Sequence, residues 1–273
     1  MRTHRHNEYI PFRSEVREIH KHTDIEYTFR MAYAGDVRPG QFFEVSIPTY
    51  GEAPISVSGI GDGTVDLTIR RVGRVTNELF SRTADDGPLA LFLRGPYGNG
   101  FDLDDYRGKE LVVIAGGTGL SPVRGVVDHF ARHPEEVDGL TLIAGFKSPS
   151  DILFFDDLAR WKRSANVILT VDCMGEDDAN PVCQVGLVTE HIAALRLKDV
   201  SRAVAVVVGP PMMMRFSIEG LRGFGFREEN LWISYERKMC CGIGKCGHCK
   251  IDDAYVCLDG PVFNYTRGGR LKD

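Results

Sequence analysis

The first hundred residues consist of short stretches in which β-branched and aromatic residues mix with polar ones. Turn-forming sequences such as RPGQ, GDG and DDGP separate these stretches, which cover 26–33, 41–48, 54–60, 64–72 and 89–96. Short half-buried strands divided by Gly and Pro are typical of a small antiparallel barrel or sandwich. We therefore expect residues 1–105 to form an antiparallel β barrel domain.

The pattern changes near residue 108, where continuous apolar runs begin to alternate with helical stretches. The apolar runs indicate strands buried on both faces, at 110–115, 140–146, 165–172 and 203–208. The helical stretches lie around 121–133, 150–163, 188–195 and 210–224. In the first of them Ser121 is expected to be the N-cap and Pro122 the first helical residue. Strands that alternate with helices predict a parallel sheet, here an α/β domain over 106–234.

The composition is that of a globular protein, with 43% hydrophobic and 26% charged residues in a chain of 273. No apolar run reaches the ~18 residues of a membrane-spanning helix, and the polar start MRTHRHNEYIPFR lacks the apolar core of a signal peptide. We therefore expect a cytoplasmic protein without membrane insertion. The net charge of −5, with no basic stripe, argues against a nucleic-acid partner.

Five of the seven cysteines lie in the stretch MCCGIGKCGHCKIDDAYVC near the end of the chain. Counted from the second of these five, the spacing is C-x4-C-x2-C with a distant fourth cysteine, which is the plant-type rhythm of a [2Fe–2S] cluster. We therefore expect a small iron–sulfur module over 235–273, with Cys241, Cys246, Cys249 and Cys257 as the cluster ligands.

Residues between the cysteines support a cluster. Gly242, Gly244 and Gly247 allow the backbone to wrap closely around an anionic group and to direct N–H groups at its sulfurs. The alternatives are a zinc site or free thiols, although a zinc ribbon normally has two C-x2-C pairs. Cys240 is interpreted as a neighbour of the cluster rather than a ligand, and Cys173 and Cys183 as structural thiols.

Two glycine-rich turns follow predicted strands of the α/β domain. AGGTGLSP at 115–122 and VVVGPPMMM at 206–214 would both face the crevice at the carboxyl ends of the strands. Such a turn lets the backbone approach a pyrophosphate at a helix N-terminus. The alternative for each is a tight structural turn between strand and helix.

The barrel contains candidates for a flavin site in APISVSG at 53–59 and IRRVGRVTNEL at 69–79. Arg70 offers charge, Gly73 a close backbone approach and Thr76 a hydroxyl suited to a diphosphate. From the residues alone, a strand followed by a helix that Thr76 caps is the better interpretation. A turn rich in Gly and Asn would likewise explain RGPYGNGF at 94–101.

Taken in order, these motifs resemble the ferredoxin-NADP reductase superfamily, in the branch that carries a C-terminal [2Fe–2S] cluster. The resemblance rests on VRPGQFFEVSIP, GEAPISVSG, IRRVGRVTNEL, LRGPYGNGF, AGGTGLSPVRG, VGPPMMM and the cysteine stretch. This branch includes the electron-transfer subunit of dihydroorotate dehydrogenase, the gamma subunit of some NiFe hydrogenases and the corresponding subunit of anaerobic sulfite reductase. The chain looks most similar to the last of these, through VRPGQFFE, GEAPIS and GPVFNY.

The resemblance implies bound FAD and NADH as the coenzyme, with the redox centres being the cofactors and no catalytic side chain. Ala53 and Ile55 depart from the Arg-x-Tyr-Ser/Thr segment of the family and cannot supply its arginine or its aromatic ring. The flavin contacts implied are Pro54, Ile55, Ser56, Ile69, Arg70, Val72, Gly73 and Thr76. The nucleotide contacts implied are Gly116, Gly117, Thr118, Gly119, Pro122, Asp172, Gly209, Pro210 and Met213.

The function implied is that of an oxidoreductase subunit that passes electrons from NADH through FAD and the cluster to a partner subunit. The resemblance favours an anaerobic sulfite reductase, whose partner subunits hold further iron–sulfur clusters and a siroheme-type centre. The alternatives are the same module serving a NiFe hydrogenase or dihydroorotate dehydrogenase, or a non-catalytic redox sensor.

The coenzyme preference is expected to follow from TVDCMGEDDAN at 170–180, which corresponds to the stretch where NADP-selective members of the superfamily grip the 2′-phosphate. Asp172, Glu176, Asp177 and Asp178 are carboxylates, which accept hydrogen bonds from a ribose diol and repel a phosphate. Lys147, in a neighbouring loop, is a cation that would instead favour a 2′-phosphate. The alternative interpretation is that the acidic stretch is a surface loop that does not contact the nucleotide.

Overall fold

A computed structural model describes residues 7–83, 89–174 and 183–272. The N-terminal strands form a closed antiparallel barrel in the order β1-β2-β5-β4-β3-β6. Their bounds are β1 Phe12–Lys21, β2 Glu26–Ala32, β3 Phe42–Ile47, β4 Gly51–Gly61, β5 Thr64–Arg70 and β6 Ala90–Tyr97. Helix α1, Arg74–Arg82, packs on the barrel between β5 and β6 in the chain. The prediction of an antiparallel barrel is confirmed.

Alternating side chains fill the barrel. Phe43, Val45 and Ile47 of β3 point inward and are at most 1% exposed, because successive side chains of a strand face opposite sides. They share one apolar cluster with Phe29 of β2 and Leu67 of β5. The barrel is therefore a solid core, and any ligand site must lie on its outer surface.

The second domain is a seven-stranded sheet in the order β10-β9-β8-β7-β11-β12-β15. Every pairing is parallel except that of β12 with β15. The strands are β7 Glu110–Gly116, β8 Gly139–Phe146, β9 Asn166–Val171, β10 Gln184–Val185, β11 Val204–Val208, β12 Leu231–Ser234 and β15 Val262–Asn264. The predicted parallel sheet of an α/β domain is confirmed.

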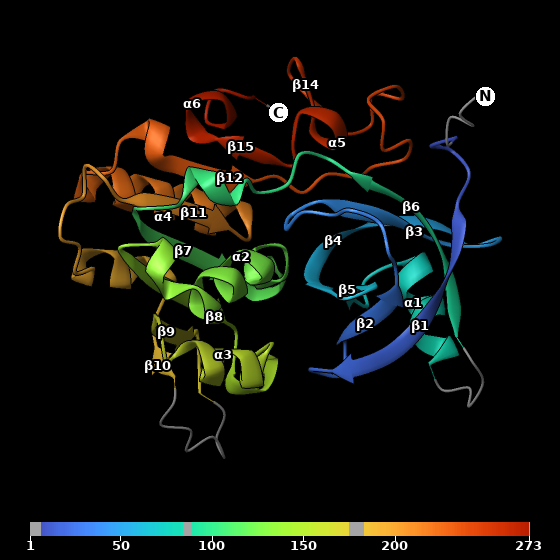
Figure 1. The fold of residues 1–273 in the computed structure, drawn as a ribbon, viewed down its shortest axis with the longest axis horizontal. Coiled ribbons are helices and arrows are strands. Elements are labelled where there is room, and N and C mark those ends of the chain that lie inside the picture. The colour runs from blue at the N-terminus through green and yellow to red at the C-terminus, as the bar shows by residue number, and fades with distance from the viewer. Residues whose placement is uncertain (1–6, 84–88, 175–182, 273) are drawn as a thin grey trace.

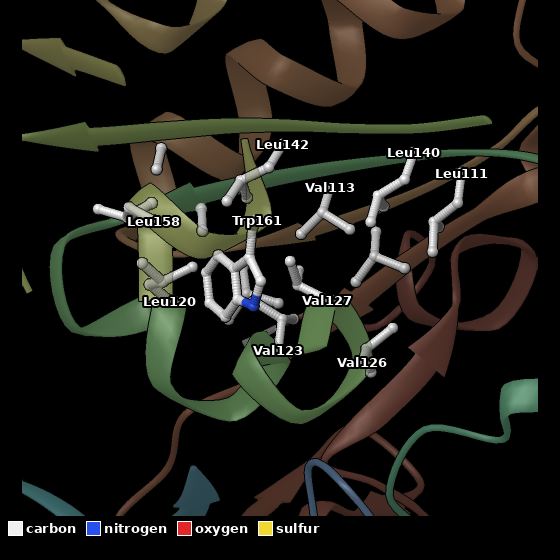
Figure 2. Packing of buried hydrophobic residues seen from close by; sticks show 14 of the residues in the cluster. Leu111, Val113, Leu120, Val123, Val126, Val127, Leu140, Leu142, Leu158 and Trp161 are labelled. Atoms are coloured by element: carbon white, nitrogen blue, oxygen red, sulfur yellow. The ribbon is translucent and has the colours of Figure 1, made fainter. Parts of the chain in front are cut away.

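Helices cover both faces of this sheet. On one face, α2 Leu120–Arg132 and α3 Phe155–Trp161 bury apolar side chains against β7 and β8, with Trp161 wholly enclosed (Figure 2). On the other face lie α4, Pro211–Phe224, and a 3-10 helix at Val188–Ala194. Among the described residues, no helix combines the length and the apolar character needed to cross a membrane.

The C-terminal segment lies across one end of both domains (Figure 1). It contains β13 Lys250–Ile251, β14 Ala254–Tyr255, α5 Val256–Asp259, β15 and α6 Tyr265–Gly268. Cys249 and Cys257 are buried in the same apolar cluster as β12 and α4. The cysteine stretch is thus built onto the sheet and also lies over the barrel.

Three helix predictions differ from the structure. Ser121 is not the N-cap of α2, because a 3-10 turn at Gly117–Gly119 leads directly into a helix that starts at Leu120 with Gly119 as its N-cap. The helix expected over 150–163 is limited to α3, since Phe154 adopts a left-handed conformation with φ 56°. The stretch 188–195 forms a 3-10 helix instead of an α-helix.

Candidate functional site

A cleft of about 610 Å³ lies where the barrel, the α/β domain and the approach to the cysteines meet. One wall comes from β4 and the end of β5, and a second from the turn that follows β7. The third wall is the segment 234–239, which leads from β12 to Cys240. Three parts of the chain that the sequence associates with three different redox groups therefore line one cleft.

The barrel wall carries most of the predicted flavin residues. Those that line the cleft are Pro54, Ile55, Ser56, Arg70, Val72 and Thr76. The Nε of Arg70 pairs with Oε1 of Glu26 at 3.1 Å, and the arginine side chain is 41% exposed. This pairing holds the stem of Arg70 at the cleft wall, and the exposed part of its guanidinium is available to an anionic ligand.

Two predicted flavin residues are not among the residues that line the cleft. Ile69 is 1% exposed and belongs to the barrel core. Gly73 is the N-cap of α1, and its N–H donates to Oγ1 of Thr76 at 2.9 Å. The N–H of Val72 donates to the same hydroxyl at 3.0 Å. The interpretation of Thr76 as a capping residue is therefore confirmed, while its position also brings it to the cleft.

The two glycine turns of the α/β domain pack against each other. A Cβ on Gly119 would lie 2.5 Å from the carbonyl oxygen of Val208, and one on Gly116 would overlap the sulfur of Met213. A larger residue at position 119 would collide with the backbone at the end of β11, and one at position 116 would displace the side chain of Met213. Gly209 has φ +159° and continues into Pro210 and α4. The structure thus brings both turns to the same edge of the sheet.

Residues of the first turn reach the cleft itself. Thr118 and Pro122 line it, whereas Gly116, Gly117, Gly119, Gly209, Pro210 and Met213 form the paired turns beside it. Asp172 directly follows β9 and is exposed, and its N–H donates to the carbonyl of Phe146 at 3.0 Å. It is not among the cleft residues and lies two strands away from β7. Glu176, Asp177 and Asp178 lie outside the described residues.

Ser121 is a site residue that the sequence pattern assigned to another role. It lines the cleft, it is 4% exposed, and its hydroxyl has no hydrogen-bond partner among the described residues. A buried hydroxyl without a partner is costly unless a ligand or water satisfies it. Together with the exposed end of Arg70, this hydroxyl shows that the cleft fits a polar cofactor with hydrogen-bonding edges. The sequence pattern missed this role of Ser121 because it made Ser121 the N-cap, whereas α2 already begins at Leu120.

The four predicted cluster cysteines lie close to one another. The thiol of Cys246 interacts with that of Cys241, and the thiol of Cys257 interacts with those of Cys249 and Cys241. Backbone donors surround them: the N–H of Gly244 donates to the sulfur of Cys257 at 3.1 Å, and that of Lys245 to the sulfur of Cys241 at 3.3 Å. Such N–H groups stabilise thiolates and cluster sulfurs.

The donor set at these cysteines can be compared with those of two kinds of metal centre. Within the described part of the chain, no three His, Cys, Asp or Glu side chains gather as they would around a single ion. A zinc ribbon needs four ligands around one metal, whereas each iron of a two-iron cluster takes two cysteines. Four cysteines in one stretch with this spacing form a candidate site for an iron–sulfur cluster. Cys240 is exposed, and Cys173 and Cys183 lie far along the chain from these four cysteines.

Comparisons with known proteins agree with this layout. Residues 113–218 match the oxidoreductase NAD-binding domain, and residues 236–267 match the iron–sulfur cluster binding domain of dihydroorotate dehydrogenase B. A solved NADH-dependent reduced ferredoxin-NADP oxidoreductase superposes with a TM-score of 0.74 at 23% identity, over 92% of this chain and 87% of that one. The fold is thus that of an NAD-binding reductase with an appended iron–sulfur domain.

Relatives in sequence define the family. The chain is 34% identical to the gamma subunit of sulfhydrogenase 1 from Pyrococcus furiosus, over 95% of this chain and 92% of that protein. It is also 34% identical to a probable dihydroorotate dehydrogenase B electron transfer subunit from Thermoplasma volcanium, over 92% of this chain and 88% of that protein. The protein belongs to the family of oxidoreductase electron-transfer subunits that includes these two proteins.

Proposed function

We propose that this protein takes electrons from NADH and delivers them, through bound FAD and a [2Fe–2S] cluster, to a partner subunit. The observation that carries this proposal is the shared cleft, in which β4, the turn after β7 and the segment before Cys240 face one another. Bound FAD would supply the conversion between the two-electron chemistry of a nicotinamide and the one-electron chemistry of a cluster.

The residues of the chain bind and orient in this proposal, and none needs to act as an acid or base. Arg70 would hold the anionic part of FAD, and Ser56 and Ser121 offer hydroxyls to its polar edges. The backbone at Gly117 and Gly119 would approach the pyrophosphate of NADH at the start of α2. The segment 236–239 lines this site and leads directly into the cysteine stretch.

The purified chain is expected to yield FAD on acid extraction and to reduce an artificial one-electron dye with NADH. Neither measurement requires a partner subunit. A folded preparation that releases only FMN, or no flavin, would contradict the assignment of FAD. A preparation that binds NADH and FAD without reducing the dye would favour a redox sensor.

The relatives also indicate what kind of partner to expect. The two relatives from Pyrococcus and Thermoplasma are named as subunits of a sulfhydrogenase and of dihydroorotate dehydrogenase B, which favours a hydrogenase or a dihydroorotate dehydrogenase as the terminal enzyme. An anaerobic sulfite reductase, with a siroheme-type centre in its partner subunits, is the second candidate on the strength of the sequence motifs. In each case the partner holds the terminal catalytic centre.

The partner can be identified by purifying the tagged chain from its own cells and assaying the complex. We expect subunits with further iron–sulfur clusters to co-purify, and NADH oxidation to depend on an electron acceptor at the terminal centre, either protons, which are reduced to H2, or orotate, which is reduced to dihydroorotate. Sulfite-dependent NADH oxidation, together with a siroheme spectrum, would instead support the second candidate. Recovery of the chain alone at native concentration would contradict a stable complex.

A further inference from the structure

Arg94 of β6 connects the barrel to the cysteine stretch. Its side chain is 4% exposed, and it binds Glu52 of β4 through two hydrogen bonds, Nε to Oε1 at 2.9 Å and Nη2 to Oε2 at 2.5 Å. The same guanidinium donates to the backbone carbonyls of Cys240 at 2.9 Å and Cys241 at 3.0 Å. A single buried cation therefore holds the backbone at the first predicted cluster ligand.

All five N–H donors of this guanidinium are used, because Nη1 also donates to the hydroxyl of Tyr97 at 3.2 Å. A lysine has three donors on a point charge and cannot reproduce this planar arrangement. Glu52 raises the pKa of Arg94 further, so the cation stays charged throughout the physiological range. The geometry thus requires arginine in particular.

A second contact fixes the same loop. Gly242 has φ +74°, and a Cβ on it would lie 2.6 Å from the ring of Tyr97. The hydroxyl of Tyr97 in turn donates to the carbonyl of Glu8 at 2.6 Å. The backbone at 240–242 is therefore held by hydrogen bonds on one side and by close packing on the other.

A second carboxylate, that of Glu44, lies near Arg94 in addition to that of Glu52. Glu44 is 0% exposed, and its carboxylate oxygens have no hydrogen-bond partner among the described residues. Burial raises the pKa of Glu44 to about 7, while the charge of Arg94 opposes this shift. Glu52, which makes two hydrogen bonds to Arg94, is thus the direct counter-charge to a buried cation near Cys241.

We propose that Arg94, held by Glu52, is a positioning residue that anchors the Cys240 and Cys241 backbone to the barrel and places positive charge beside the cluster. This inference rests on the proposed function. The segment 237–239, which lines the cleft, leads directly into the anchored residues. Arg94 therefore controls two properties at once: the ease with which the anionic cluster accepts an electron, and its placement relative to the cleft.

The test measures the midpoint potential of the cluster by a redox titration followed by EPR, on the purified holoprotein. The titration is run at one fixed pH for all variants. Arg94→Gln removes the cation and is expected to disfavour reduction about tenfold, which is about 59 mV for a one-electron couple. Glu52→Gln removes the counter-charge and is expected to shift the potential in the opposite direction.

Two further variants separate charge from geometry. Arg94→Lys keeps the charge but not the planar donors, so we expect a potential close to wild type with slower electron transfer from flavin to cluster. Arg202→Gln removes an exposed arginine, 68% accessible, that lies just before the amino-terminal end of β11, and should leave the potential unchanged. Shifts of the same sign in Arg94→Gln and Glu52→Gln, or no shift in either, would overturn the proposal.

A measurement without any cluster distinguishes this inference from the proposed function. In the iron-free chain, amide hydrogen exchange at 240–245 is expected to be about tenfold faster in Arg94→Gln than in wild type, because the anchor limits local opening. Unchanged exchange would refute the anchor. The opposite outcome is also distinguishable. If the wild-type protein never binds iron, yet Arg94→Gln still accelerates exchange at 240–245, the proposed function is refuted and the anchor remains supported.

Discussion

Replacing Cys241 with alanine is expected to abolish the iron–sulfur absorption and EPR signal while FAD stays bound. Cys241 pairs with Cys246, and its sulfur accepts N–H bonds from Lys245 and Cys246 at 3.3 and 3.4 Å. Loss of one thiolate leaves one iron without a ligand, which a compact cluster does not tolerate. The flavin residues lie on the barrel and do not depend on this thiol. The measurement is the visible spectrum and iron content of the purified variant.

Cys240→Ala is the matched control, because this neighbour has the same side chain and a different environment. Cys240 is exposed and takes part in the fold through its carbonyl, which accepts from Arg94. The variant keeps that carbonyl, so we expect an intact cluster. Loss of the cluster in Cys240→Ala with survival in Cys241→Ala would mean that the first ligand is one residue earlier.

The positions of most barrel strands along the chain and the class of each domain were predictable from local patterns, but the closure of the barrel was not. The sequence pattern indicated β2 to β6 and missed β1, whose ten residues are mostly exposed. A register shift between Val16 and Glu18 interrupts the regular alternation of apolar and polar side chains in β1. Long-range pairing with β2 and β6, rather than its own pattern, makes this segment a strand.

In the candidate site, too, some features could be predicted from short sequence motifs, and others depend on contacts between distant parts of the chain. Glycine turns and cysteine spacing have recognisable sequence patterns, because backbone conformation and metal chemistry restrict the residues allowed there. The free hydroxyl of Ser121 depends on the start of α2. The bonds of Arg94 join residues 146 and 147 positions apart in the chain. No local sequence pattern predicts a contact between residues so far apart in the chain, so this contact is visible only in the folded structure.

NADH is expected to be used with at least about tenfold higher kcat/KM than NADPH, a difference of about 1.4 kcal/mol in transition-state binding. Asp172 follows β9, and the N–H of the next residue, Cys173, donates to the carbonyl of Lys147 at 3.1 Å. Asp172 and Lys147 are therefore neighbours at the carboxyl ends of β9 and β8, and both are exposed. A carboxylate here accepts hydrogen bonds from a ribose diol and repels a 2′-phosphate.

Two variants decide which of these neighbours governs the choice. Asp172→Asn keeps the size of the side chain and removes its charge, so we expect NADPH to gain several-fold in kcat/KM while NADH loses. Lys147→Ala should change the ratio little, because the repulsive carboxylate remains in place. The measurement is steady-state dye reduction with each coenzyme at matched ionic strength, since exposed charges are screened by salt. Equal efficiencies in the wild type, or a preference for NADPH that disappears in Lys147→Ala, would show that the lysine binds the phosphate and dominates the acidic side chain.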